Sequence, residues 1–153
     1  MAAAQPLLVH LLKLASLINR PMQEGVAGPA GLSLNELRIM MCLHGEGPCA
    51  GHEITILMGI PPMNVSRAVA SLGARGWVEP AADPANRRRR PVRLSAAGVA
   101  ACAALAPDLD HVARHALGSL SAGDMAALDR IATGLIGRLE RWPSTRKPVP
   151  EDG

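Results

Sequence analysis

Four consecutive arginines, Arg87–Arg90, form the densest group of charged side chains in the chain. A guanidinium group carries several N–H donors in a fixed fork that matches the oxygens of a phosphate. Adjacent like charges repel one another, so such a run either meets an external anion or stays in a solvated loop. The run therefore predicts a contact with a polyanion, with a solvated turn as the alternative.

A second group of polar side chains recurs at helical spacing before this run. It consists of Asn64, Arg67, Ser71 and Arg75. Intervals of three, four and four residues place all of them on one helix face. Asparagine can pair bidentately with adenine, and arginine with guanine, in the major groove of DNA. The predicted DNA-binding residues are Met63, Asn64, Ser66, Arg67, Ser71, Arg75, Arg87, Arg88, Arg89 and Arg90. Of these, we expect Arg75, at the helix end, to pack or pair locally.

The positive charge of the chain is concentrated around these residues. The chain of 153 residues has a formal net charge of +3, but residues 60–95 hold seven arginines against Glu79 and Asp83, a local charge of +5. The other nine basic and eleven acidic side chains give −2. A local field of this kind is expected of a surface that binds nucleic acid. The absence of Phe and Tyr disfavours the aromatic stacking used by readers of RNA and single strands.

A helix–turn–helix pattern positions the first polar group. Ser33 and Glu36 have the spacing of a capping box and predict a helix over residues 33–44. A short helix is expected over residues 50–58, followed by a proline-initiated helix over residues 62–75 that carries the polar face.

A β-hairpin is expected to carry the arginine run. Strand candidates over residues 77–82 and 91–95 flank the turn-forming residues 83–86. The arginines then lie at the hairpin tip and at the start of the returning strand. The chain is predicted to be mainly α with a small β-hairpin, of the α+β class.

Helices are also expected outside this lobe. Residues 7–20 predict a helix so apolar that it needs a partner on most of its surface, and residues 21–31 read as a flexible connection. Two further helices are expected over residues 96–142, the first kinked or broken at Pro107. Residues 143–153 are expected to form a flexible tail.

Other function classes find little support. Cys42, Cys49 and Cys102 are odd in number and form no CxxC, which suits a reducing cytoplasm, and Cys49 is the best candidate for a reactive thiol. No run predicts a membrane span, and no phosphate loop or nucleophile–base pattern predicts an enzyme. His111 and His115 have metal-ligand spacing on one helix face, which keeps a metal-sensing regulator as an alternative. Neither a cofactor nor a structural metal is expected.

The stretch from Asn64 to Gly98 resembles the signature of the MarR family of winged-helix regulators. In that family the reader helix ends at Arg-Gly, here Arg75-Gly76. An Asp-Pro-x-Asp-Arg-Arg wing follows, here running from Asp83 to Arg88, and a Leu-Thr-x-x-Gly helix start, here running from Leu94 to Gly98. The order of the expected helices extends the resemblance over most of the chain.

The resemblance implies a single domain over residues 1–142. Residues 33–95 would form the DNA-binding lobe, while residues 7–20 and 96–142 would interlock with a second copy in a homodimer. Such a dimer would bind a pseudo-palindromic operator in double-stranded DNA, with half-sites about 10 base pairs apart.

The family also implies how the chain would act. The reader helix would enter the major groove, and Arg87 or Arg88 would reach the adjacent minor groove. Many members are repressors that leave DNA when a small, often aromatic, acid binds, so a ligand-responsive repressor is expected here. The effector-binding residues are unknown; possible contributors are His10, Arg38, His44 and Trp77.

One residue departs from the family pattern. The acid expected before the paired arginines, which pairs with an arginine to hold the wing, is Asn86. An amide accepts only a neutral hydrogen bond, so wing order is less well defined by the resemblance than helix order. An alternative is a winged-helix module that binds a protein and no longer binds DNA.

Overall fold

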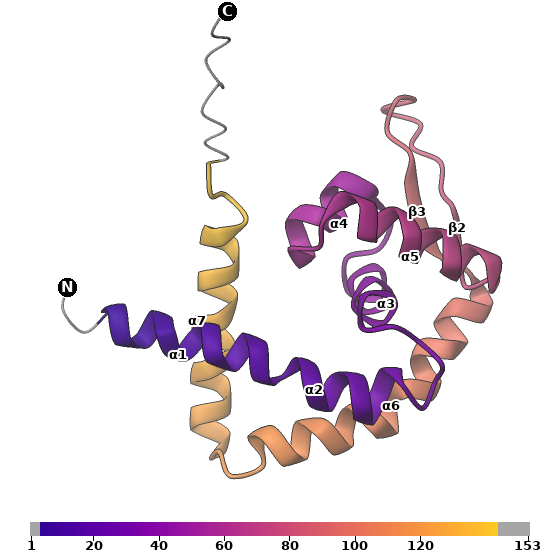
Figure 1. Cartoon of the computed structure of the whole chain (residues 1–153). Helices are drawn as coiled ribbons and strands as arrows, with labels where there is room; N and C mark the ends of the chain where they lie inside the picture. The colour runs from indigo at the N-terminus through magenta and orange to yellow at the C-terminus, as the bar shows by residue number, and fades with distance from the viewer. Residues whose placement is uncertain (1–3, 144–153) are drawn as a thin grey trace, which may run out of the picture. The chain divides into compact units, whose positions relative to one another are not determined.

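The structure, a computed structural model, describes residues 4–143. Its elements in chain order are α1 (Ala4–Leu17), α2 (Asn19–Met22), the π-helical turn η1 (Gln23–Ala27), α3 (Leu34–Glu46), β1 (Cys49–Ala50), α4 (Gly51–Met58), α5 (Pro62–Ala74), β2 (Val78–Pro80), β3 (Pro91–Leu94), α6 (Ala96–Leu117) and α7 (Ala122–Leu139) (Figure 1). The chain divides into two compact units, one ending at Gly118 and one beginning at Ser119. The expected class, mainly α with a small antiparallel sheet, is confirmed.

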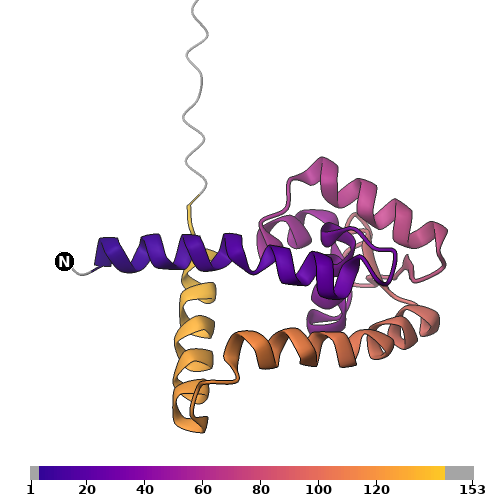
Figure 2. The same ribbon diagram turned by 60° about the horizontal axis from the view of Figure 1, so that its bottom comes forward.

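Helix α3 forms the centre of the first unit, between the α4–α5 pair and α6 (Figures 1 and 2). It begins at the expected capping box, in which the Ser33 N–H donates to Glu36 Oε2 at 2.7 Å and the Glu36 N–H donates to Ser33 Oγ at 3.2 Å. Its fully buried side chains, Leu37, Ile39 and Met40, contribute to a core that is almost entirely aliphatic. Local capping fixes where the helix starts, and burial fixes its orientation.

The helix–turn–helix is built from α4 and α5. Gly59 ends α4 in the left-handed conformation with φ of 61°, which glycine adopts without steric cost. Pro62 is the first residue of α5, where its missing N–H leaves no hydrogen bond unmade. Val65, Ala68 and Leu72 are buried, so the opposite face of α5 is turned to solvent.

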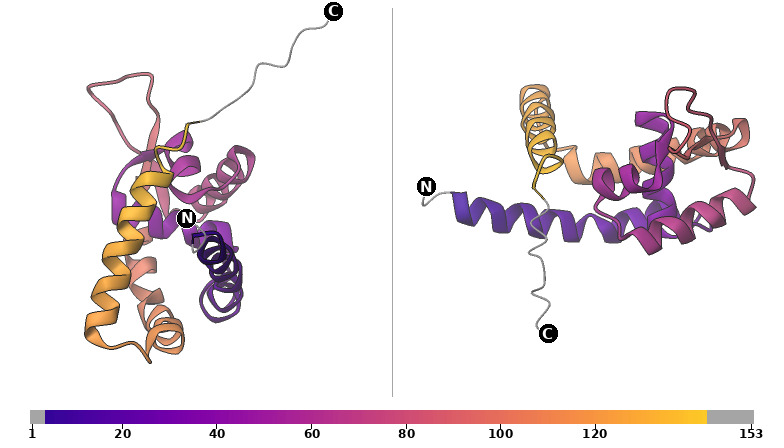
Figure 3. Two further views of the ribbon diagram at one scale, coloured as in Figure 1. Left: turned by 90° about the vertical axis from the view of Figure 1, so that its left-hand side faces the viewer. Right: turned by 90° about the horizontal axis from the view of Figure 1, so that it is seen from above.

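The wing is the hairpin formed by β2, β3 and the loop over residues 81–90. The three strands form an antiparallel sheet in the order β1-β3-β2, with Val78 opposite Leu94 and Cys49 opposite Val92. The two-residue strand β1 was not predicted, because two residues are too few to show the alternation of apolar and polar side chains that indicates a strand. It is recognisable only from its pairing with β3. Figure 3 shows the loop projecting beyond the sheet.

Two expectations about the helices are wrong. Residues 21–31 are not a flexible connection: α2 and η1 continue the helical path to Ala27, because Val26 and Ala27 are fully buried in the core. The interruption between α1 and α2 lies at Ile18, next to Leu17, whose carbonyl receives no N–H from Pro21. Helix α6 is also continuous through Pro107, so the break that was one of the two outcomes expected there is wrong. The carbonyl of Ala103 that loses its donor there lies on an exposed part of the helix, while Leu105 and Val112 pack in the core.

Apolar side chains remain uncovered on two helices. No residue of α1 is buried, and Leu17 is 71% exposed. In the second unit, α7 is capped by Ser121, whose hydroxyl accepts the Asp124 N–H at 3.1 Å, and the helix has no buried residue. Within residues 4–143, no helix combines the length and apolarity needed to cross a membrane. Apart from Pro143, the expected tail lies outside the described residues.

Candidate nucleic-acid interface

The solvent-facing side of α5 carries the predicted reader residues. Met63, Ser66 and Arg67 are exposed, and Asn64 is half-buried at the first turn. Beside them, a depression of about 290 Å³ between α5 and the start of α3 is lined by Ser33, Asn35, Glu36, Asn64, Arg67, Ala68 and Ser71. The face therefore presents amide, hydroxyl and guanidinium groups without a bulky apolar side chain other than Met63.

Ser71 has a partner within the chain. Its hydroxyl donates to Oε1 of Glu36, a buried carboxylate whose other oxygen caps α3. Burial raises the pKa of Glu36, but the hydrogen bonds from Ser71 and Ser33 outweigh it and leave the pKa below its ordinary value. Ser71 thus joins the reader helix to α3, and its predicted role in DNA contact stays a prediction.

Arg75 packs locally. Its guanidinium carbon lies 5.2 Å from the centroid of the Trp77 ring, and its Nη2 donates to the carbonyl of Gly31. The expectation of local packing at the end of α5 is met in these contacts, which connect the helix to the turn before α3. Contact of Arg75 with DNA remains a prediction.

The arginine run divides into one inward and three outward side chains. Arg89 is partly buried, whereas Arg87, Arg88 and Arg90 are exposed. Among the ion pairs within residues 4–143, none includes one of these three exposed arginines. Their charges are therefore available to an external anion, whereas that of Arg89 is already paired.

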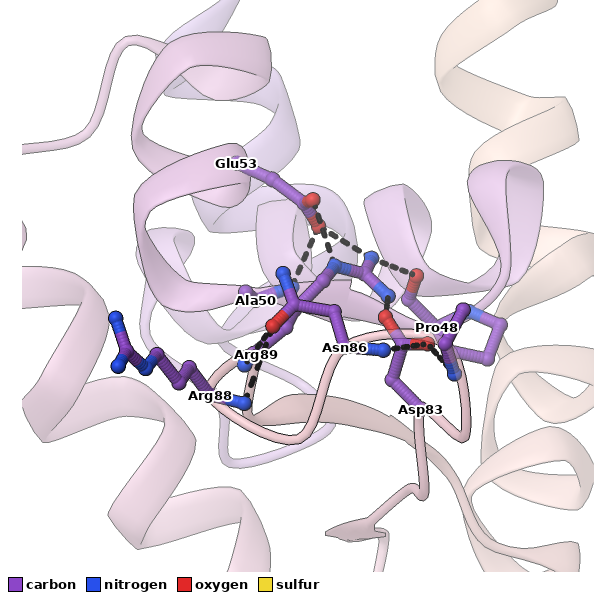
Figure 4. A network of polar contacts seen from close by, with 8 residues as sticks. Pro48, Ala50, Glu53, Asp83, Asn86, Arg88 and Arg89 are labelled. Atoms are coloured by element: carbon purple, nitrogen blue, oxygen red, sulfur yellow. Dashed lines mark hydrogen bonds and ion pairs between the residues drawn. The ribbon is translucent and has the colours of Figure 1, made fainter.

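Arg89 joins the wing loop to α4 and to the turn before β1 (Figure 4). Its Nε and Nη2 donate to Oε1 and Oε2 of Glu53 at 2.8 and 2.7 Å, which is a bidentate pair. Its Nη1 donates to Asp83 Oδ2 at 3.1 Å and its Nη2 to the carbonyl of Pro48 at 3.3 Å. The Ala50 N–H also donates to Glu53 Oε2, at 2.7 Å, so this carboxylate both caps α4 and holds the arginine.

The Glu53–Arg89 pair persists over a wide pH range. Hydrogen bonds from Arg89, and then that from the Ala50 N–H, lower the pKa of Glu53 from 4.5 to about 2. A carboxyl group whose pKa is lowered on folding stabilises the fold above its unfolded-state pKa, and this contribution is lost as the pH falls through the folded value. The pair is therefore fully ionised near neutral pH.

Asn86, the departure from the family pattern, organises the loop by hydrogen bonds. Its Oδ1 accepts the N–H groups of Arg88 and Arg89 at 3.1 and 3.3 Å. Asp83 Oδ1 accepts those of Ala85 and Asn86 at 3.1 and 3.2 Å. These are the side-chain turns that Asn and Asp favour. Asp83 supplies the ion pair that Asn86 cannot make.

The residues considered for redox or metal sensing are not arranged for it. Cys49 is buried, and burial raises its pKa, so it lacks the thiolate character of a reactive cysteine. Burial likewise raises the pKa of Cys42 to about 12. Among residues 4–143, no group of three or more His, Cys, Asp and Glu side chains is placed to hold a metal ion, so His111 and His115 lack further ligands there.

A second depression, of about 340 Å³, lies between α3 and α6. It is lined by Met41, His44, Gly45, Val99, Cys102, Ala103, Leu105, Ala106 and Leu109. Of the possible effector contacts, only His44 lines it. Arg38 instead donates to the carbonyl of Met58, and Trp77 packs under Arg75.

The role of Glu53 was missed in the sequence. A capping-box search requires a Ser, Thr, Asp or Asn at the first position, and Ala50 stands there. Glu53 at the third position of α4 was the available signal, because acids are favoured in the first turn of a helix.

Comparison with known proteins agrees with this geometry. The model of the MarR family matches residues 32–89, which span the helix–turn–helix and most of the wing loop. None of the curated protein sequences matches the chain. Among solved structures, a probable transcriptional regulator from Pseudomonas aeruginosa is 25% identical, with a TM-score of 0.64 over 83% of this chain and 94% of that one.

Two further structures share the fold. BpsR of Bordetella bronchiseptica, whose DNA binding is regulated by 6-hydroxynicotinic acid, is 21% identical, with a TM-score of 0.67 over 84% of this chain and 97% of BpsR. A mutant MarR from E. coli complexed with operator DNA is 18% identical, with a TM-score of 0.66 over 85% of this chain and 93% of MarR. The winged-helix part of the chain, residues 32–89, thus matches the MarR family model, and the fold over most of its length is shared with these regulators.

Proposed function

We propose that this protein is a transcriptional regulator that binds double-stranded DNA with sequence specificity. The observation that carries the proposal is the combination of an exposed polar face on α5 with three exposed wing arginines, Arg87, Arg88 and Arg90, which form no ion pair within residues 4–143. Cations on the wing supply affinity through the phosphates, and the reader helix supplies choice among sequences.

Each element suits one groove of a duplex. The first turns of α5 carry Asn64, Ser66 and Arg67 toward base edges in the major groove. Arg87 or Arg88 reaches the minor groove, whose negative potential is strongest where A·T pairs narrow it. Arg90 is left for the phosphate backbone.

The functional unit is a homodimer. Support comes from the apolar side chains on α1, including Leu7, Leu12 and Leu17, and on α7, including Ile136 and Leu139, all of them exposed. Covering these surfaces with a second copy removes a large apolar area from water. Two lobes then bind a pseudo-palindromic operator with half-sites about 10 base pairs apart.

The protein acts as a repressor that a small molecule releases from DNA. BpsR provides a precedent for regulation of DNA binding by a small aromatic acid. The apolar depression lies between α3, at the centre of the lobe, and α6, the helix that follows the wing. A small molecule bound there would change how α3 and α6 pack against each other.

Titration against the DNA flanking its own gene, with random duplex as competitor and at two salt concentrations, tests the proposal. We expect saturable binding that survives the competitor. The log–log salt slope should be about −0.9 for each phosphate neutralised. Operator binding no tighter than binding to random DNA contradicts sequence specificity. Binding to a protein partner with an affinity independent of salt would instead favour the protein-interaction module.

Replacing Arg67 with alanine should relax the preference for one base pair. If Arg67 reads guanine, its loss costs about 1–3 kcal/mol at that position and leaves the salt slope nearly unchanged. Competition binding with operators randomised at single positions measures this. A uniform loss over all sequences would instead assign Arg67 to phosphate contact.

A further inference from the structure

The wing loop has one ion-paired attachment to the helices of its lobe. Within residues 4–143, Arg89 is the loop residue whose side chain pairs with an acid outside the loop, namely Glu53. The atoms involved come from three places in the chain: α4, the turn at Pro48, and Asp83 at the start of the loop. Figure 4 shows the guanidinium enclosed by these acceptors, while the Arg88 side chain points away from them.

The hydrogen bonds of Arg89 leave little for a phosphate. Its Nε, Nη1 and Nη2 donate four hydrogen bonds within the chain, two of them to one carboxylate. Its side chain is 26% exposed, and that of Glu53 is 31% exposed. The ion pair between the two wing strands, Arg93–Glu79, has a single contact and is more open, with side chains 57% and 45% exposed.

We propose that Glu53 is a positioning residue for DNA binding, acting through Arg89. The pair holds the loop against α4, so that Arg87, Arg88 and Arg90 are turned outward before any DNA arrives. This inference rests on the proposed DNA-binding function, and it reassigns Arg89 from DNA contact to attachment of the wing. A loop ordered in advance loses less conformational entropy on binding than a free one, which favours the complex.

The direction in which DNA affinity changes when the Glu53 charge is removed distinguishes a positioning role from a general electrostatic effect. Glu53 carries a negative charge in the lobe that would face a polyanion. Removing that charge should tighten DNA binding if only the overall field matters. If Glu53 positions the wing, the same change should weaken binding. Glu53→Gln keeps the size of the side chain and an oxygen to cap α4, and removes only the charge.

The test measures operator affinity of the full-length protein and its Glu53→Gln variant, with Glu79→Gln as the matched control. We expect Glu53→Gln to bind about threefold to fivefold more weakly, the range of a partly exposed ion pair, and Glu79→Gln to bind as tightly as the wild type or more tightly. Arg89→Gln should weaken binding as well. The double variant should lose little more than either single variant, because each removes the same interaction.

Trypsin cleavage of the free protein gives a second readout that does not depend on DNA. The wing of Glu53→Gln retains every arginine, so faster cleavage after Arg87–Arg89 than in the wild type reports a looser loop. Equal or tighter operator binding by Glu53→Gln, or unchanged cleavage, overturns the inference while the proposed function stands. Failure of the wild-type protein to prefer its operator overturns the proposed function itself.

Discussion

The double variant Arg87→Ala, Arg88→Ala is expected to bind every DNA sequence about a hundredfold more weakly than the wild type, since each lost guanidinium removes charge-assisted contacts. The log–log salt slope should become shallower by about 1.8, which is two contacts at about 0.9 each. Both side chains are exposed, and neither forms an ion pair within the described residues, so the fold should keep its stability. Titration at several salt concentrations measures affinity and slope together.

A control of equal charge distinguishes local contact from the general field. Arg114 on α6 and Arg130 on α7 are also exposed arginines, and replacing both with alanine removes the same two charges outside the wing. This control should change affinity only slightly, and sedimentation should show the same oligomer for all three proteins. Equal losses in the two double variants would assign the wing effect to net charge, and no loss in the wing variant would remove the wing from the interface.

Features encoded by adjacent residues were predicted well from the sequence. Ser33, Ser95 and Ser121 each cap the helix that was expected to start there, and Gly59 and Gly76 take positive φ where α4 and α5 end. These features depend on the conformational preferences of one to four residues, which do not need a tertiary partner.

Features decided by distant residues were not predicted. Residues 21–31 carry three glycines and two prolines and read as a loop, but burial of Val26 and Ala27 against the core outweighs that preference. Strand β1 exists because β3 pairs with it. In both cases the stabilising partner lies far along the chain, so the local amino-acid composition and the spacing of apolar residues do not predict the structure there.

The same distinction applies to the candidate site. As a sequence, Arg87–Arg90 is four identical residues, and nothing local separates Arg89 from its neighbours. Its position opposite Glu53, 36 residues away, makes the difference. The family resemblance predicted the helix–turn–helix and the wing, which the structure contains, whereas the distinction between the paired Arg89 and its three exposed neighbours needed the three-dimensional arrangement.

Gly98 shows how closely the start of α6 approaches the backbone of Trp77, the residue before β2. A Cβ on this residue would lie 2.0 Å from the carbonyl oxygen of Trp77. The same oxygen accepts the Ser95 N–H at 3.0 Å, and the Ser95 hydroxyl accepts the Gly98 N–H at 3.1 Å. The obstacle is backbone held by hydrogen bonds, so a change of side-chain rotamer does not relieve the overlap.

Replacing Gly98 with alanine should therefore lower the free energy of unfolding by about 2 kcal/mol. Alanine gains about 1 kcal/mol in helix propensity, but overpacking against a fixed neighbour costs about 1–3 kcal/mol or more, and a 2.0 Å approach lies at the upper end. Denaturant unfolding measures the change. Gly73→Ala in α5, where the added Cβ would meet Val78 O at an ordinary 3.8 Å, should instead stabilise the protein by up to about 1 kcal/mol.

Because of the position of Gly98, the same variant tests the placement of the wing relative to α5 as well as stability. Helix α6 follows β3 directly, and Trp77 precedes β2, so a displaced α6 start moves both strands of the wing relative to α5. We expect Gly98→Ala to weaken operator binding even at temperatures where it remains folded, and Gly73→Ala to bind normally. If Gly98→Ala unfolds at the same denaturant midpoint as the wild type, α6 begins farther from Trp77 than the structure places it. The helix and the wing would then be less tightly coupled.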